Sequence, residues 1–279
     1  MRIHIVDVFA EARFAGNQLA VVRDCAALSG DAMQTIAREM NFSETTFVLE
    51  ETESRAKVRI FTPGRELPFA GHPTLGTAWV LGHRRPTYRL ELQAGNVDVT
   101  FDGAAGVAWM TPPTPVLGKP FPNERAAKML GLAVADLATE LPVQFVAIGP
   151  EFLFVGVRDL AAVKRAKLDE PYFRQCMAEG LPFHAVFVFA PQAYSRDAHY
   201  AARLFFDANG VREDPATGSA NSGFAAYLHA HLKKPIDVVV EQGFEIQRPS
   251  RLYLRADANG VRVGGRVQAV VEGTLRTTG

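Results

Sequence analysis

The chain has 279 residues, more than a single hydrophobic core readily accommodates, so we expect two domains. Lysine plus arginine and aspartate plus glutamate each number 30, and the resulting net charge of zero argues against a nucleic-acid or anionic-membrane partner. The two cysteines, Cys25 and Cys176, have no motif around them, which favours a reducing cytoplasm over a disulfide scaffold.

The first half of the chain reads as strands and helices in succession. Residues 1–7 predict a strand, and Asp7 interrupts the apolar stretch that a signal peptide would need. Residues 33–40 have apolar positions at the spacing of one helical face. No apolar run approaches the roughly 20 residues that cross a membrane, so we expect a cytoplasmic protein without a membrane partner. Further strands are expected at 45–49, 57–62, 87–92, 96–101 and 106–110, with a second helix opening at Gly71.

Prolines mark the middle of the chain. The run 111–115, followed by Pro120 and Pro122, predicts a linker because proline cannot donate to a strand ladder. After this linker the same kinds of element return in the same order. We expect helices at 173–180 and from Gly218, and strands at 185–189, 201–207, 236–242, 251–256 and 261–271.

Two segments, 68–81 and 215–228, align with each other without a gap. They share proline, glycine, glycine, alanine and leucine at the pairs 68/215, 71/218, 76/223, 78/225 and 81/228. A duplication explains this better than chance because the elements upstream of each segment also recur in order. The predicted fold class is α+β, with two pseudo-symmetric lobes in which long helices pack on strongly bent sheets.

Glycine-containing turns open both repeated helices, at Gly71-His72-Pro73 and at Gly218-Ser219-Ala220. The N-terminus of a helix presents unpaired N–H groups and partial positive charge, so it suits a carboxylate, and glycine lets the backbone approach a ligand. The alternative is ordinary capping, with Ser219 as an N-cap and Gly71 as a turn residue. Their equivalence in the repeat favours two helix N-termini that serve one ligand.

Polar residues break the repeat, as a single asymmetric ligand would require. His72 corresponds to Ser219, and Asp214 corresponds to Leu67. Glu44 lies where a helix gives way to a strand. Facing inward it would be a partly desolvated carboxyl suited to general acid/base catalysis, and facing outward a solvated glutamate. Asp214 is alternatively an ordinary Asp-Pro turn residue.

Other chemistries find little support. No nucleotide-binding glycine motif and no clustered cysteine and histidine site occurs, so neither a nucleotide nor a metal is expected. His229 and His231 would not share one side of a helix, so we interpret them as an exposed turn. Ser219, His72 and Asp214 lack the surrounding motif of a hydrolytic triad.

At these residues the sequence resembles the PhzF-like family, named for an isomerase of phenazine biosynthesis. The Asp-Pro-Ala-Thr-Gly-Ser motif at 214–219 and the Gly-His-Pro motif at 71–73 are the most specific similarities. The resemblance covers essentially the whole chain in the family's order. Further matching stretches are 6–9, 14–22, 41–45, 61–63, 68–76, 213–220, 264–267 and 272–273.

The resemblance implies a diaminopimelate-epimerase-like fold, in which each lobe is a bent, mostly antiparallel sheet around a central helix and the last strand returns to the first lobe. We therefore expect an N-terminal lobe of 1–115 plus about 265–279 and a C-terminal lobe of 116–264. The resemblance further implies a homodimer, no cofactor, and Glu44 as the residue that shuttles a proton. The implied substrate-contacting set is Ser43, Gly71, His72, Asp214, Gly218 and Ser219.

One departure from diaminopimelate epimerases decides between reactions. Those enzymes use a cysteine from each lobe, and the corresponding positions here are Ala70 and Thr217, which are neither acids nor bases. Racemisation by two bases needs one group on each side of the carbon, whereas one carboxyl can move a proton along one face. We therefore predict a proton-shift isomerase of a small carboxylate-bearing metabolite, with an acid/base site between the lobes. An amino-acid epimerase or racemase and a non-catalytic two-lobed binding protein are the alternatives.

Overall fold

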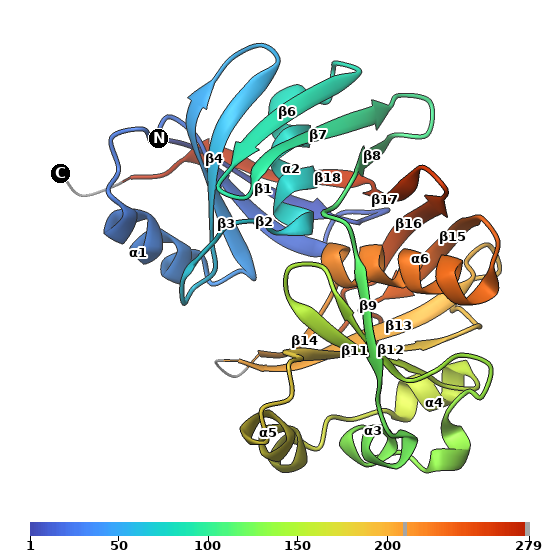
Figure 1. Ribbon diagram of the computed structural model, residues 1–279. Helices are drawn as coiled ribbons and strands as arrows, with labels where there is room; N and C mark the ends of the chain where they lie inside the picture. Colours follow the sequence, from blue (N-terminus) through green and yellow to red (C-terminus); the bar gives the residue numbers. More distant parts are fainter. Residues whose placement is uncertain (209–210, 277–279) are drawn as a thin grey trace. The chain divides into compact units, whose positions relative to one another are not determined.

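The computed structural model describes residues 1–208 and 211–276. The chain divides into two units (Figure 1), the first comprising Met1–Thr111 with Val263–Gly279 and the second Pro112–Arg262. Among the described residues, none of the helices has the length and apolar character needed to span a bilayer.

The first unit consists of a curved sheet and its helices. Its strands are β1 (Arg2–Val8), β2 (Asn17–Val22), β3 (Glu44–Glu51), β4 (Arg55–Phe61), β5 (Glu66–Leu67), β6 (Thr87–Leu92), β7 (Gly95–Asp102), β8 (Val107–Met110) and β18 (Val267–Thr274), and its helices are α1 (Gly30–Met40) and α2 (Gly71–Gly82). Helix α2 packs against β1, β2 and β6, whereas α1 packs against β3 and β4. The α2 helix is therefore the central helix of this unit (Figure 1).

The second unit is built in the same way. Its strands are β9 (Val116–Pro120), β10 (Gln144–Ala147), β11 (Glu151–Gly156), β12 (Ala185–Ala190), β13 (Tyr200–Ala208), β14 (Val211–Asp214), β15 (Ile236–Gln242) and β16 (Ser250–Asp257), and its helices are α3 (Asn123–Met129), α4 (Leu160–Arg165), α5 (Glu170–Ala178) and α6 (Gly218–Leu232). Helix α6 packs against β10, β15 and β16. A separate core of apolar side chains joins the sheet to α3, α4 and α5.

The strand pairing of β1 to β7 recurs in β10 to β16. In each series the first pair is antiparallel, and the second, β2 with β3 or β11 with β12, is parallel. Two antiparallel pairs follow, then the parallel pair β4 with β6 or β13 with β15, and a last antiparallel pair. The predicted α+β fold class, with two pseudo-symmetric lobes and mostly antiparallel sheets around a central helix, is confirmed.

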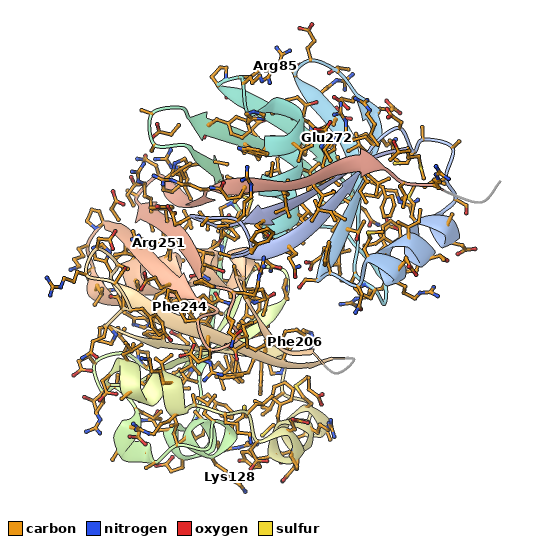
Figure 2. The ribbon with its side chains drawn as sticks, turned by 180° about the vertical axis from the view of Figure 1, so that it is seen from behind. Arg85, Lys128, Phe206, Phe244, Arg251 and Glu272 are labelled. Carbon is orange, nitrogen blue, oxygen red and sulfur yellow. The ribbon has the colours of Figure 1, made fainter. Side chains whose placement is uncertain are left out.

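The outermost strands extend this pattern. Strand β9 pairs with β10, and β18 pairs with β1, placing Arg2 opposite Thr274. Figure 2 shows β18 running across the first unit, with Glu272 marking it. The strand expected at 261–271 is interrupted at Arg266, which separates β17 (Gly260–Gly265) from β18. Next to this break the backbone packs closely on Phe9, since a Cβ at Gly265 would lie 2.2 Å from Phe9 Cδ1.

Other sequence expectations need correction. Residues 111–115 form no helix or strand, but the predicted linker is shorter than expected because Pro120 ends β9 at the edge of a sheet, where a missing N–H is tolerated. Helices α3 and α4 were not expected, since each is too short to show helical periodicity. His229 and His231 lie in the last turn of α6 instead of an exposed turn.

Both central helices are buried on most sides by the surrounding sheet, so neither has the charged face of a surface helix. Glycines at equivalent positions make this close approach possible. A Cβ at Gly76 would lie 2.7 Å from Val8 Cγ2 and 2.6 Å from Leu19 Cδ2, and a Cβ at Gly223 would lie 2.3 Å from Ile148 Cδ1. Gly76 and Gly223, one of the glycine pairs shared by the repeat, therefore have a packing role.

Replacing Gly76 by alanine should lower the free energy of unfolding by about 1–3 kcal/mol, the usual cost of overpacking. The loss outweighs the helix propensity of alanine, which favours the variant by about 0.5–1 kcal/mol. Urea unfolding, monitored by circular dichroism, measures this loss in the free energy of unfolding. As a control, Gly103→Ala adds a Cβ with no atom within 4 Å and should change stability by less than about 0.5 kcal/mol. Equal stability of the two variants would contradict the packing role of Gly76.

Candidate active site

Glu44 is the first residue of β3 and follows the end of α1 closely. The helix ends at Met40 and is followed by the C-cap residue Asn41, whose left-handed conformation (φ 52°) turns the chain toward the strand. In the parallel pair of β2 and β3, Glu44 lies opposite Leu19. Its side chain is 16% exposed, so the carboxyl is partly withdrawn from water, and Ser43 beside it is also partly buried.

His72, the second residue of α2, lies against this carboxyl. Its side chain is 6% exposed, and its Nδ1 lies 3.5 Å from Glu44 Oε2. Its Nε2 lies 3.3 Å from the carbonyl oxygen of Gln18, at the start of β2. Three elements, β2, β3 and α2, thus bring together two of the predicted site residues. Glu44 therefore points inward, as the catalytic interpretation requires.

The imidazole of His72 is neutral near pH 7. Burial lowers its pKa to about 3, and the hydrogen bond with the Gln18 carbonyl offsets this only in part. The contact with Glu44 is short enough for an ion pair, but a neutral ring cannot form one. Because a carbonyl oxygen only accepts hydrogen bonds, Nε2 carries the ring hydrogen, and Nδ1 presents its lone pair to the Glu44 carboxyl.

The starts of the two central helices lack side-chain caps. The N-cap residues are Ala70 for α2 and Thr217 for α6, and neither side chain accepts a hydrogen bond from its own helix. The alternative interpretation of Ser219 as an N-cap and Gly71 as a turn residue is therefore wrong, since Gly71 and Gly218 are the first helical residues. No cap side chain competes with a ligand for the first N–H groups of either helix.

In the second unit, Asp214 ends β14 and precedes the turn into α6. Its Oδ2 accepts a hydrogen bond from Thr217 Oγ1 at 2.5 Å, so the Asp-Pro turn interpretation accounts for part of its role. Gly218 is buried and Ser219 is partly buried at the start of the helix. The predicted site residues accordingly form two groups: Ser43, Glu44, Gly71 and His72 in the first unit, and Asp214, Gly218 and Ser219 in the second.

Two contributors were not found from the sequence. Gln18 acts through its backbone carbonyl, for which its side chain gives no signal. Gln242, which is fully buried, donates to the Asp214 carbonyl oxygen at 2.9 Å. A glutamine that ends the apolar strand 236–242 is a signal that sequence reasoning could have used, because buried amides need partners.

Neither cysteine lies at a helix start. Cys25 is buried, its thiol donates to the Val48 carbonyl oxygen at 3.1 Å, and burial raises its pKa to about 11. Cys176 is buried in α5, with its sulfur 3.2 Å from Arg125 Nη2. A thiol base is thus absent from the starts of α2 and α6, both of which belong to the described part of the chain.

Comparisons with known proteins identify the family of this chain. The family model PhzC-PhzF, described as phenazine biosynthesis-like protein, matches residues 6–274. The chain is 39% identical over 270 residues to trans-2,3-dihydro-3-hydroxyanthranilate isomerase of Pseudomonas aeruginosa, with 94% of this chain and 92% of the relative covered.

Solved structures show the same fold. A phenazine biosynthesis protein of the PhzF family from Bacillus anthracis superposes with a TM-score of 0.88 at 27% identity, covering 99% of both chains. A probable proline racemase from Agrobacterium radiobacter shares the fold at a TM-score of 0.65 and 13% identity, covering 99% of this chain and 93% of its own. The chain therefore belongs to the PhzC-PhzF family of phenazine biosynthesis-like proteins and is a PhzF-like isomerase.

Proposed function

We propose that this chain is a cofactor-independent isomerase that moves a proton within a small carboxylate-bearing metabolite, with Glu44 as the general acid and base. The observation that carries the proposal is the contact between Glu44 and a neutral His72 at the start of a buried helix. A carboxyl that is 16% exposed, beside a ring without charge, can exchange a proton with a substrate near neutral pH.

The proposed reaction needs no oxidant and no second base. The Glu44 carboxylate removes a proton from one carbon of the substrate, and the electrons of that C–H bond enter the conjugated system. The Glu44 carboxyl then returns the same proton to another atom on that face, so a double bond shifts and no atom is gained or lost. Between these steps Nδ1 of His72 accepts a hydrogen bond from the protonated carboxyl.

The N–H groups at the helix starts suit a carboxylate. Helix α2 begins at Gly71 and α6 at Gly218, each without a side-chain cap, and each end carries partial positive charge. The Pseudomonas aeruginosa relative is named for an anthranilate derivative, which is a ring carrying a carboxylate. Gly71, Gly218 and Ser219 are proposed to hold such a group, with Ser43, His72 and Asp214 contacting other parts of the substrate.

The epimerase alternative is less well supported. Two-base racemisation needs an acid or base at the start of each central helix. Ala70 has no such group, and the hydroxyl of Thr217 already donates to Asp214. The likeness to a proline racemase concerns the fold alone.

Replacing Glu44 by glutamine should lower turnover at least about 10²-fold, because the amide keeps the shape of the carboxyl but cannot transfer a proton. The assay follows conversion of trans-2,3-dihydro-3-hydroxyanthranilate in deuterium oxide and measures deuterium in recovered substrate and product. Calorimetry with 3-hydroxyanthranilate, an aromatic analogue, should show binding within about threefold of the unchanged protein. Glu50→Gln, at an exposed position of the same strand, is the matched control and should leave turnover unchanged. Turnover by Glu44→Gln close to the control would remove Glu44 from the catalytic role.

His72 should make the chain less stable in mild acid. Its pKa is about 3 when folded and about 6.5 when unfolded, so the unfolded chain binds the extra proton as the pH falls below 6.5. Between pH 7.5 and 5.5 this linkage costs about 1.4 kcal/mol of stability. His72→Asn should remove that part of the pH dependence in urea unfolding, and His83→Asn, at an exposed position, should not. Identical pH dependence in both variants would mean that His72 is not buried as a neutral ring.

A carboxylate should bind at a helix start. In crystals soaked with 4-bromobenzoate, the anomalous signal of bromine locates the ring. The carboxylate is expected within hydrogen-bonding distance of the backbone N–H of Gly71, Gly218 or Ser219, since such contacts contribute about 0.3–1 kcal/mol each. A carboxylate held instead by an arginine away from α2 and α6 would show that the anion site is elsewhere.

A further inference from the structure

We infer that Gln242 is a positioning residue that orients the Asp214 carboxylate through the hydroxyl of Thr217. The inference rests on the proposed function, in which Asp214 contacts the substrate. Gln242 is the last residue of β15 and is fully buried. Figure 2 labels Phe244, which follows Gln242 by two residues in the sequence.

The side-chain amide of Gln242 contacts both ends of the loop that precedes α6. Its Nε2 lies 2.9 Å from the Asp214 carbonyl oxygen and 3.1 Å from Thr217 Oγ1. Its Oε1 lies 3.4 Å from the Thr217 backbone nitrogen and 2.9 Å from Asn221 Nδ2. One side chain thus connects the residue that ends β14 with the first turn of the helix.

The backbone groups fix the direction of these hydrogen bonds. The Asp214 carbonyl oxygen can only accept and the Thr217 N–H can only donate, so the amide of Gln242 has one possible orientation. Its NH2 group therefore donates to the Thr217 hydroxyl. That hydroxyl in turn has its own hydrogen available for Asp214 Oδ2, 2.5 Å away. The chain of hydrogen bonds from Gln242 through Thr217 requires Asp214 to accept, which suits an ionised carboxylate.

The repeat supplies an internal comparison. In the first unit, Ala70 stands where Thr217 does, and Leu67 where Asp214 does. The loop before α2 is held by a backbone hydrogen bond from Ala94 to Pro68 at 3.1 Å, and the helix forms without any such side-chain network. Starting a central helix therefore does not require the Gln242 network. What the second unit has in addition is an acidic side chain whose orientation must be set.

The residue after Gln242 keeps the strand end pressed against the loop. Gly243 has φ +80°, a conformation that favours glycine. A Cβ there would lie 2.6 Å from the Pro215 carbonyl oxygen and 2.4 Å from that of Arg248. This close backbone contact leaves the Gln242 amide little room to move away from Asp214.

The variant Gln242→Met keeps the length of the side chain and removes both its donor and its acceptor. The matched control is Gln144→Met, since Gln144 is also a buried glutamine of this unit, bonded to the Gly118 carbonyl oxygen and to His231. Thr217→Val removes the hydroxyl and keeps the shape, and Thr217→Ser restores the hydroxyl. The double variant Gln242→Met with Thr217→Val tests whether the two residues act in series.

The kinetic measurement uses trans-2,3-dihydro-3-hydroxyanthranilate and reports KM separately from kcat. We expect Gln242→Met and Thr217→Val each to raise KM about 10-fold or more, with kcat changed less than about threefold, since a misplaced Asp214 weakens substrate binding. The double variant should be no worse than the more affected single variant. Thr217→Ser and Gln144→Met should have the KM of the unchanged protein.

If the unchanged protein does not turn over trans-2,3-dihydro-3-hydroxyanthranilate, the dissociation constant of 3-hydroxyanthranilate, measured by calorimetry, replaces KM. If it binds neither compound, a crystal structure of Gln242→Met decides the matter by the position of the Asp214 carboxylate, with Gln144→Met as the reference. A carboxylate that moves supports the inference, and one that stays in place overturns it.

The inference is wrong if Gln242→Met and Gln144→Met lower thermal stability alike and both leave substrate affinity unchanged. It is also wrong if the effects of Gln242→Met and Thr217→Val on KM add in the double variant. Two residues that act through the same chain of hydrogen bonds cannot have independent effects. These outcomes are separate from the proposed function. That proposal fails if Glu44→Gln retains turnover, whatever the behaviour of Gln242.

Discussion

Each unit depends on one helix that its own sheet buries. A helix can occupy that position only if its backbone comes very close to the surrounding strands, which is why Gly76 and Gly223 have no room for a Cβ. Burial on most sides also agrees with the absence of aspartate, glutamate, lysine and arginine from both helices. The N–H groups of its first turn have no side-chain cap, so they are free of competition from a capping side chain.

Burial also sets the chemistry beside α2. Because His72 is withdrawn from water, its ring stays neutral, and the Gln18 carbonyl decides which nitrogen carries hydrogen. The Glu44 carboxyl therefore meets a lone pair and no positive charge. A charged histidine at the same place would hold the carboxylate as an ion pair and make it a weaker base. The packing that builds the fold thus also selects the protonation state of the site.

Sequence reasoning reached the fold class and the relevant loops because the repeat carries glycines and apolar residues at fixed positions. Gly71 and Gly218 occupy equivalent positions in the two repeated segments, and each is the first residue of its helix. Glu44 remained ambiguous, since a strand with apolar residues on both faces gives no alternation to read. Contacts made by a backbone carbonyl, as at Gln18, or by a side chain 28 residues distant, as from Gln242 to Asp214, depend on tertiary structure. The close packing of Gly265 on Phe9, next to the break at Arg266, likewise depends on tertiary structure.

The pairing of β18 with β1 has a consequence for synthesis on the ribosome. Strand β1 is made before its partner β18, although the two pair side by side in the folded chain and Leu275 donates a hydrogen bond to the Met1 carbonyl oxygen. The second unit is continuous from Pro112 to Arg262, so all of its residues emerge before those of β18. The unit that begins the chain is therefore the later one to be completed. Until then one edge of β1 has unpaired backbone groups, an exposure that a nascent chain shares with other incomplete sheets.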